Sequence, residues 1–192
     1  EMKPIPIGWF RGHLYKGRWP SFYCTNNPRF VEYIRQQVYL FCEIGSDAIM
    51  VDDSGGTFFA AHRGGCFCPY CMSGFRDYLK NKYSTEQLQG MGVENTDTFD
   101  YRQMVLKHVK DTKTYIPMAK KGESPLSADF FDFLVRSDVA LFESLKTMSC
   151  KLAGRYVPMG WDNVDFAGSR APYYPFLDAS ISEINHQHFS VG

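Results

Sequence analysis

Residues 47–79, DAIMVDDSGGTFFAAHRGGCFCPYCMSGFRDYL, decide the fold that we expect for this chain. Ala48 to Val51 is a short apolar run without polar alternation, which is typical of a strand buried on both faces of a parallel sheet. The run ends at Asp52 and Asp53. In α/β folds, ligands gather where the strands end, so we expect chemistry at these carboxylates. Adjacent strand residues point to opposite faces, so only one of the two can face a given pocket.

A dense cysteine cluster follows the predicted strand. Cys66, Cys68 and Cys71 are too closely spaced for ordinary mutual disulfides, whereas thiolates at close spacing are typical of a tetrahedral zinc site. A closed structural site needs four ligands. Cys24 lies before the preceding helix, at the carboxyl end of the strand, and is the expected fourth ligand, with His62 in reserve. The sequence therefore predicts a zinc-binding loop at 62–72, closed by a cysteine from outside it.

The other two cysteines, Cys42 and Cys150, sit inside apolar helical patterns. There a cysteine is usually a small buried hydrophobic residue, and we expect that role for both.

Helical and strand patterns alternate along the rest of the chain. Asn27-Pro28 is a helix start, because Asn can cap free amides and Pro needs no amide proton there. The expected helices are about 28–44, 72–83, 101–113 and 127–153, with at most short helices in 84–101, and the further expected strands are 156–161 and 177–184. The region 1–23 is expected to be irregular. This rhythm predicts an α/β fold, either a parallel barrel or a doubly wound sheet.

Composition excludes several classes of protein. The 192 residues carry a formal net charge of +0, with 44% hydrophobic and 16% aromatic residues, which argues against a disordered chain. No apolar run reaches the roughly 18 residues of a membrane-spanning helix. Nucleic-acid binders usually show a basic excess, which this chain lacks. A polar, uncharged ligand fits better, and aromatic faces can stack on sugar rings.

The cysteine pattern resembles a known family of enzymes. Cys24, the run Cys66-Phe-Cys-Pro-Tyr-Cys71 with an acidic strand end before it, and Phe75-Arg-Asp-Tyr-Leu79 after it are similar to the family 42 β-galactosidases and related glycoside hydrolases. The similarity extends to 129–133 and to 161–163. It implies a (β/α)8 TIM barrel with a four-cysteine structural Zn²⁺ site beside the active site. It also implies that Asp53 is the general acid/base, although the family has Asn-Glu where this chain has Asp52-Asp53.

The same resemblance implies that the barrel is incomplete in this chain. The family carries its nucleophile at the end of the seventh strand, and the predicted strand at 177–184 is the sixth by this count. A barrel takes about 250 residues. We therefore expect residues 1–192 to form part of a glycoside-hydrolase-like barrel domain, containing roughly the third to sixth βα units. The partner is then the remainder of the same barrel, or another copy in a homo-oligomer.

Glycoside hydrolysis needs a second carboxylate near Asp53, roughly 5 Å away in a retaining enzyme. Asp162, Asp165 and Glu183 each follow or end a predicted strand, and Glu183 is favoured because Asn185 and His186 are its neighbours. We expect Asp53 and Glu183 to be catalytic. The remaining candidates for the substrate-binding site are Trp9, Asp52, Trp161, Asn163 and His186.

The sequence thus predicts a soluble glycosidase that acts on a galactoside or related carbohydrate and binds neither nucleic acid nor membrane. Thiolate zinc sites favour a reducing location such as the cytoplasm. One alternative is a non-catalytic carbohydrate-binding barrel with a structural zinc site, because Asp-Asp replaces Asn-Glu. Another is a zinc module for a protein or nucleic-acid partner, which the neutral charge and the lack of a second cysteine pair disfavour.

Overall fold

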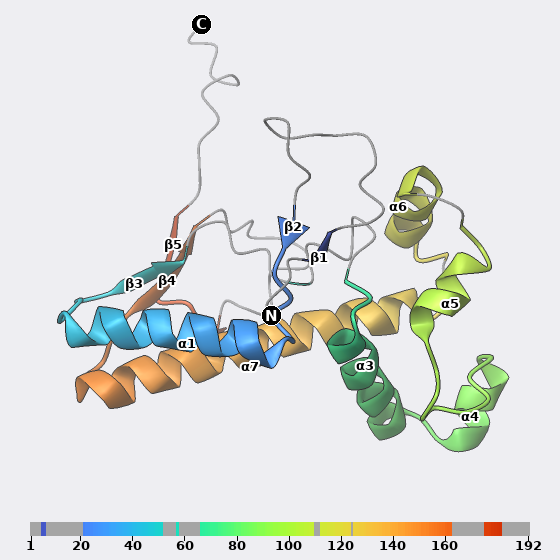
Figure 1. The fold of residues 1–192 in the computed structure, drawn as a ribbon, viewed down its shortest axis with the longest axis horizontal. Helices are drawn as coiled ribbons and strands as arrows, with labels where there is room; N and C mark the ends of the chain where they lie inside the picture. Colours follow the sequence, from blue (N-terminus) through green and yellow to red (C-terminus); the bar gives the residue numbers. More distant parts are fainter. Residues whose placement is uncertain are drawn as a thin grey trace, which may run out of the picture. The chain divides into compact units, whose positions relative to one another are not determined.

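The computed structural model describes residues 5–6, 21–51, 57, 66–109, 112–123, 125–162 and 175–181. The chain divides into two compact units. Unit 1 comprises Glu1–Tyr33 and Gly55–Asp138, and unit 2 comprises Ile34–Ser54 and Val139–Gly192. The elements (Figure 1) are β1 (Ile5–Pro6), β2 (Ser21–Phe22), α1 (Pro28–Glu43), β3 (Ile49–Val51), α3 (Pro69–Lys82), α4 (Thr85–Gly90), α5 (Tyr101–Leu106), α6 (Thr112–Lys121), α7 (Ser127–Ala153), β4 (Met159–Asp162) and β5 (Ala179–Ile181). Among the described helices, none is both long and apolar enough to cross a membrane.

Three parallel strands form the sheet of unit 2. They lie side by side in chain order, β3, β4 and β5. Ile49 is opposite Met159, and Gly160 is opposite Ala179. The expected strand at 48–51 is confirmed. Strand β4 begins at Met159 rather than at residue 156, and β5 begins at Ala179 rather than at residue 177.

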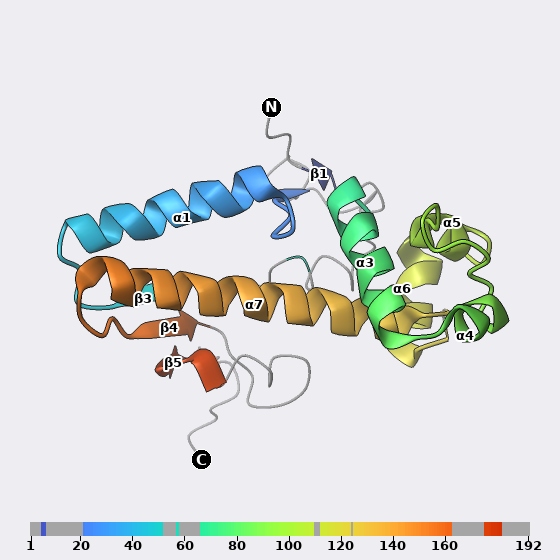
Figure 2. The same ribbon diagram turned by 90° about the horizontal axis from the view of Figure 1, so that it is seen from below.

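One face of this sheet carries the core of unit 2. Figure 2 shows β3 and β4 beside the C-terminal half of α7 (orange). The buried members of the core come from α1, α7, the strands and the segment before β4, and they are Val38, Ile49, Phe142, Leu145, Val157, Met159 and Trp161. Met50 lies between Ile49 and Val51 in β3, so its side chain points to the opposite face of the sheet. Met50 is 45% exposed there. A Cβ at Gly160 would lie 2.8 Å from the Met50 methyl carbon, so Met50 covers Gly160.

An ion-pair network lies at the amino ends of β4 and β5. Asp178 accepts a hydrogen bond from the Met159 amide at 2.8 Å and pairs with Lys146 of α7 at 2.8 Å. Tyr156 also donates to its carboxylate. Burial alone would raise the pKa of Asp178, but these donors outweigh burial and hold the pKa below its usual value. The network ties α7 to the strands without using the carboxyl ends where a site is expected.

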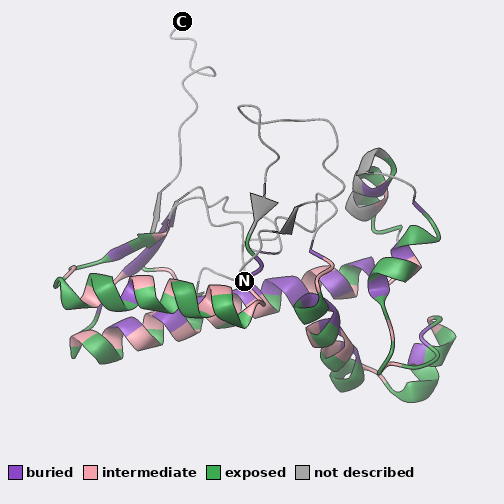
Figure 3. Cartoon of the chain, viewed as in Figure 1, coloured by how far each residue is buried: buried purple, intermediate pink, exposed green. Residues whose placement is uncertain are grey.

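Aromatic side chains form the core of unit 1. The ring of Phe75 in α3 lies 5.0 Å from that of Phe130 and 5.2 Å from that of Tyr101, centroid to centroid. Phe133 and Tyr78 complete the group around it. Figure 3 shows buried residues (purple) along α3 and along the part of α7 in this unit, where these rings originate. Three helices are thereby joined through one aromatic cluster.

The helices of unit 1 follow their local sequence signals, and three of them, α3, α5 and α6, differ from the expected ranges. Ser84 caps α4 with a full capping box, and Asp100 caps α5. Helix α3 begins at Pro69 rather than near residue 72, because Pro suits the first turn of a helix. The expected helix at 101–113 ends at Leu106 as α5, and α6 extends past the expected end to Lys121 with Pro117 in its interior.

The expected irregular region 1–23 contains one regular feature within its described residues. Ile5 and Pro6 pair antiparallel with Phe22 and Ser21, and these residues form β1 and β2.

Gly74→Ala should destabilise the chain by about 1–3 kcal/mol, the usual cost of overpacking a core. A Cβ at Gly74 would lie 2.8 and 2.9 Å from ring atoms of Phe133, whose ring is buried against Phe75 and cannot swing aside. In an open helix position the same change normally stabilises. Gly90→Ala is the control, since nothing lies within 4 Å of its Cβ position. Urea unfolding of both variants tests this, and equal stabilities would contradict it.

Candidate metal centre

A tight turn delivers Cys24 to the site. The Asn27 amide donates to the Cys24 carbonyl at 2.9 Å, which closes a turn just before α1 begins at Pro28. Asn27 Oδ1 then accepts from the Arg29 amide at 3.0 Å, so the Asn27-Pro28 helix start is confirmed. The turn places Cys24 in the buried interior of unit 1.

The start of α3 delivers the other three cysteines. Cys68 is the N-cap residue and Pro69 follows it, and the Met72 amide donates to the Cys68 carbonyl at 2.9 Å. Cys71 therefore lies in the first turn of the helix and Cys66 just before it. A helix N-terminus carries partial positive charge, which favours a thiolate at the N-cap residue Cys68.

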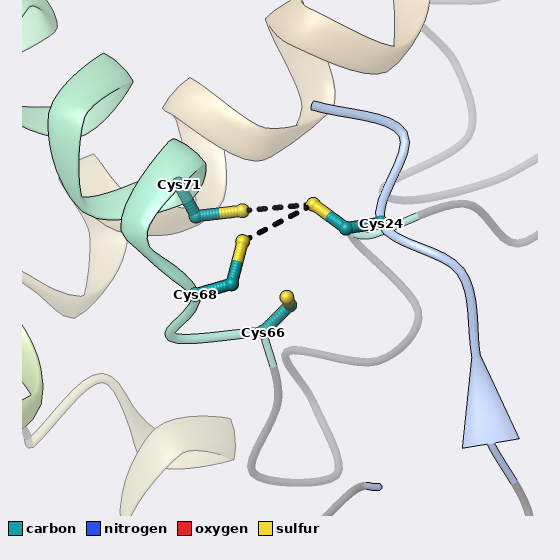
Figure 4. A group of neighbouring side chains, drawn as sticks. All are labelled: Cys24, Cys66, Cys68 and Cys71. Carbon is teal, nitrogen blue, oxygen red and sulfur yellow. Dashed lines mark hydrogen bonds between the residues drawn. The ribbon is translucent and has the colours of Figure 1, made fainter. Parts of the chain in front are cut away.

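The four sulfurs converge in space, as expected from their spacing. Cys24 Sγ lies 3.4 Å from Cys71 Sγ and 3.5 Å from Cys68 Sγ, and all four sulfurs lie within 4.8 Å of one another (Figure 4). All four are free thiols, since a disulfide needs about 2.05 Å. Tetrahedral zinc with Zn–S bonds of about 2.3 Å sets its sulfurs about 3.8 Å apart. The cluster fits a tetrahedral metal ion bound by thiolates.

The protonation of the cluster is uneven. Hydrogen bonds with neighbouring thiols, that with Cys24 first, hold the pKa of Cys68 well below the ordinary thiol value. The pKa of Cys24 is lowered as well, chiefly by Cys66. The pKa values of Cys66 and Cys71 are raised, because each hydrogen-bonds first to Cys24 and both are buried. Thiolates are the form that binds metal, so a cation at this site displaces the remaining protons.

An aromatic side chain inside the cysteine motif anchors it to the core of unit 1. Phe67 stacks on Phe130, with ring centroids 5.5 Å apart and an interplanar angle of 5°. It also lies 6.0 Å from the ring of Tyr101. The backbone between Cys66 and Cys68 is therefore fixed by packing as well as by its own turn.

Most other predicted site residues lie outside the described part of the chain. These are Trp9, Asp52, Asp53, His62, Asn163, Asp165, Glu183, Asn185 and His186. Asp162 is described only as the last residue of β4. Trp161 is described fully: it is 3% exposed and its ring stacks on Phe142 at 5.6 Å, within the core of unit 2. That surrounding is typical of a core residue.

Cys42 and Cys150 lie apart from the cluster, in unit 2. Cys42 donates to the Ser149 carbonyl at 3.7 Å, and Cys150 accepts from the Val157 amide at 3.4 Å. Both pack against the apolar core of that unit, in agreement with the role expected for them.

Two residues of the site were missed from the sequence. Asn26 Nδ2 donates to Cys71 Sγ at 3.4 Å, and Thr57 Oγ1 donates to Cys24 Sγ at 3.8 Å. The position of Asn26, two residues after a ligand, was a usable signal. Thr57 carried no local signal, because it lies 33 positions from Cys24 in the sequence and the tertiary fold brings the two side chains together.

The chain is similar to two α-agarases. The α-agarase of Thalassotalea agarivorans is 32% identical over 135 residues, which cover 65% of this chain and 9% of that protein. The α-agarase of Alteromonas agarilytica is 33% identical over 99 residues, which cover 48% of this chain and 7% of that protein. The chain thus spans less than a tenth of the length of these curated relatives. No protein-family model and no solved structure matches it.

Proposed function

We propose that this chain is part of a glycoside hydrolase that cleaves an agar-like polysaccharide. The similarity to two α-agarases carries this proposal. An agarase by name acts on agar, a galactose-based polysaccharide, which agrees with the galactoside substrate implied by the resemblance to family 42 β-galactosidases. The substrate proposed here is therefore a galactose-containing polymer.

The cysteine cluster is proposed to be a structural Zn²⁺ site. The donor set of four thiolates and the sulfur spacing support zinc. With all four ligands taken from Cys24, Cys66, Cys68 and Cys71, no open position remains for substrate, which is the pattern of a structural site. The ion would join the turn before α1 to the start of α3. It would thereby fix the two ends of the region that contains β3 and the proposed catalytic Asp53.

A (β/α)8 barrel is the proposed fold of the complete domain. Three features support it: β3, β4 and β5 are parallel, they are adjacent in chain order, and α1 and α7 pack on the sheet in unit 2. In such a barrel the active site lies at the carboxyl ends of the strands. Asp52 and Asp53 directly follow β3, and Asp162 ends β4. Further strands from the same protein would complete the ring.

The proposed chemistry uses Asp53 as the general acid/base. It would protonate the leaving oxygen and then activate water, with Glu183 as the second carboxylate. Trp9, Asp52, Asn163 and His186 remain the proposed sugar contacts. Trp161 is left out of this set because its ring belongs to the core of unit 2.

Asp53→Asn in the full-length protein should lower the rate of agar hydrolysis by about 10²–10⁴-fold, the usual contribution of a general acid or base. The release of reducing ends from agarose measures the rate. Asp47→Asn is the matched control, because Asp47 makes only a surface ion pair with Arg155 at 3.2 Å. Full hydrolysis by the Asp53 variant would refute the assigned role.

A non-catalytic carbohydrate-binding barrel is the second candidate. The observation that favours it is Asp52-Asp53 in place of Asn-Glu, since Asp is one methylene shorter than Glu. Retention of the wild-type protein on agarose without any release of reducing ends would support this candidate over the hydrolase.

A further inference from the structure

Two polar side chains outside the Cys66–Cys71 run donate hydrogen bonds to sulfurs of the cluster. Asn26 donates to Cys71, and Thr57 donates to Cys24. The two side chains donate to different sulfurs and come from different segments of unit 1. In a metal centre, the residues that hydrogen-bond to the ligands form a second layer around the ion, and Asn26 and Thr57 occupy such positions around the sulfurs.

The turn that delivers a ligand also delivers the first donor. The hydrogen bond from the Asn27 amide to the Cys24 carbonyl closes the turn, and Asn26 is inside it. Its side-chain amide then reaches across to the first turn of α3, where Cys71 is fully buried. Asn26 thus links the two segments that supply the ligands.

Neighbouring side chains orient the second donor. The Thr25 amide donates to Thr57 Oγ1 at 2.8 Å, and the Thr25 hydroxyl donates to Asp138 of α7. The hydroxyl proton of Thr57 therefore has two acceptors within reach, Thr25 Oγ1 and Cys24 Sγ. A thiolate bound to metal is charged and is the stronger acceptor of the two.

The proposed zinc site would carry a negative charge that hydrogen-bond donors can offset. A divalent ion with four thiolates has a net charge of −2, and Cys24, Cys66 and Cys71 are buried. A buried charge is costly unless hydrogen bonds offset it. We infer that Asn26 and Thr57 are positioning residues of the metal centre, which orient Cys71 and Cys24 and offset their negative charge. This inference rests on the proposed zinc site.

The test compares Asn26→Asp with Asn27→Asp in the full chain. Both variants replace one amide by a carboxylate at neighbouring positions, but only Asn26 donates to a sulfur. Asn27 uses its oxygen to accept from the Arg29 amide, a role that Asp can keep. Competition with a chromophoric chelator should show Zn²⁺ affinity about 10–100-fold weaker for Asn26→Asp than for Asn27→Asp.

A spectroscopic readout separates positioning from a general loss of structure. In the Co²⁺-substituted protein the sulfur-to-cobalt charge-transfer band should shift in Asn26→Asp and in Thr57→Val, because each sulfur loses a donor. Thr57→Ser, which retains the hydroxyl, should restore the wild-type band. A variant that misfolds loses the band instead of shifting it. If Asn26→Asp and Thr57→Val both lose the band and neither shifts it, the inference is overturned.

The outcomes also distinguish a failure of this inference from a failure of the proposed zinc site. If the wild-type chain binds neither Zn²⁺ nor Co²⁺, the zinc site itself is refuted. If the wild type binds zinc and Asn26→Asp binds it as tightly as Asn27→Asp, with unshifted bands, only the inference is overturned.

Discussion

Cys71→Ser is expected to remove tightly bound zinc from the chain, with affinity lowered at least about 100-fold, beyond the range for second-layer changes. Cys71 is fully buried and its sulfur lies 3.4 Å from Cys24 Sγ, so the substitution removes one of four closely grouped thiolates. A serine hydroxyl is a far poorer zinc ligand than a thiolate. Native mass spectrometry, followed by the same sample denatured, counts the bound ions.

The loss of the ion should also destabilise unit 1. Structural zinc contributes roughly 10 kcal/mol or more to the folding of small zinc domains. Here the aromatic core also holds the motif through Phe67, so we expect a loss of several kcal/mol rather than complete unfolding. Treatment of the wild type with a chelator should reproduce this loss. Cys42→Ser is the control, because Cys42 lies in unit 2 outside the cluster, and it should keep one zinc. Equal zinc content in the two variants would contradict the metal centre.

Phe75→Ala is expected to lower the free energy of unfolding by about 3–5 kcal/mol, as is typical for a phenylalanine removed from a core. Phe75 is 1% exposed and contacts aromatic rings from α5 and α7 as well as its own helix. Its removal leaves a cavity at the junction of three helices. Urea unfolding measures the change.

A matched variant shows what the loss of a phenylalanine costs at the surface. Phe41 in α1 is exposed, so Phe41→Ala should change the stability by no more than about 0.5 kcal/mol. Similar losses for the two variants would mean that Phe75 is not at the centre of the core of unit 1.

Helix boundaries could be predicted where local chemistry sets them. Asn27-Pro28 starts α1, and Ser127 and Gly154 bound α7, because caps and glycines act within one turn of the chain. Gly154 has φ +63°, a conformation that suits glycine. The start of α3 was placed three residues late, since the cysteine run was interpreted as loop. The single helix expected at 101–113 is wrong, since α5 ends at Leu106 and α6 begins at Thr112.

The cysteine cluster was predictable from the sequence because three of its members are close in the chain. The choice of Cys24 as the fourth required the fold to return to the same place, and the structure confirms that it does. Asn26 carried a signal in its position two residues after Cys24, whereas Thr57 could not be identified, since a hydrogen bond to a distant sulfur leaves no periodic pattern. The roles of Asp53 and Glu183 remain predictions, because both lie outside the described residues.

The distance in sequence between Cys24 and Cys71 has a consequence for the pathway of folding. They are 47 positions apart, with α1 and β3 between them. An ion that joins them turns this stretch into a closed loop, and chain-entropy arguments put the gain from such a crosslink at about 4 kcal/mol. Val38 is the buried residue of α1, so few buried side chains hold this helix in place. While the ion stays bound, the two ends of this loop stay together even when α1 opens.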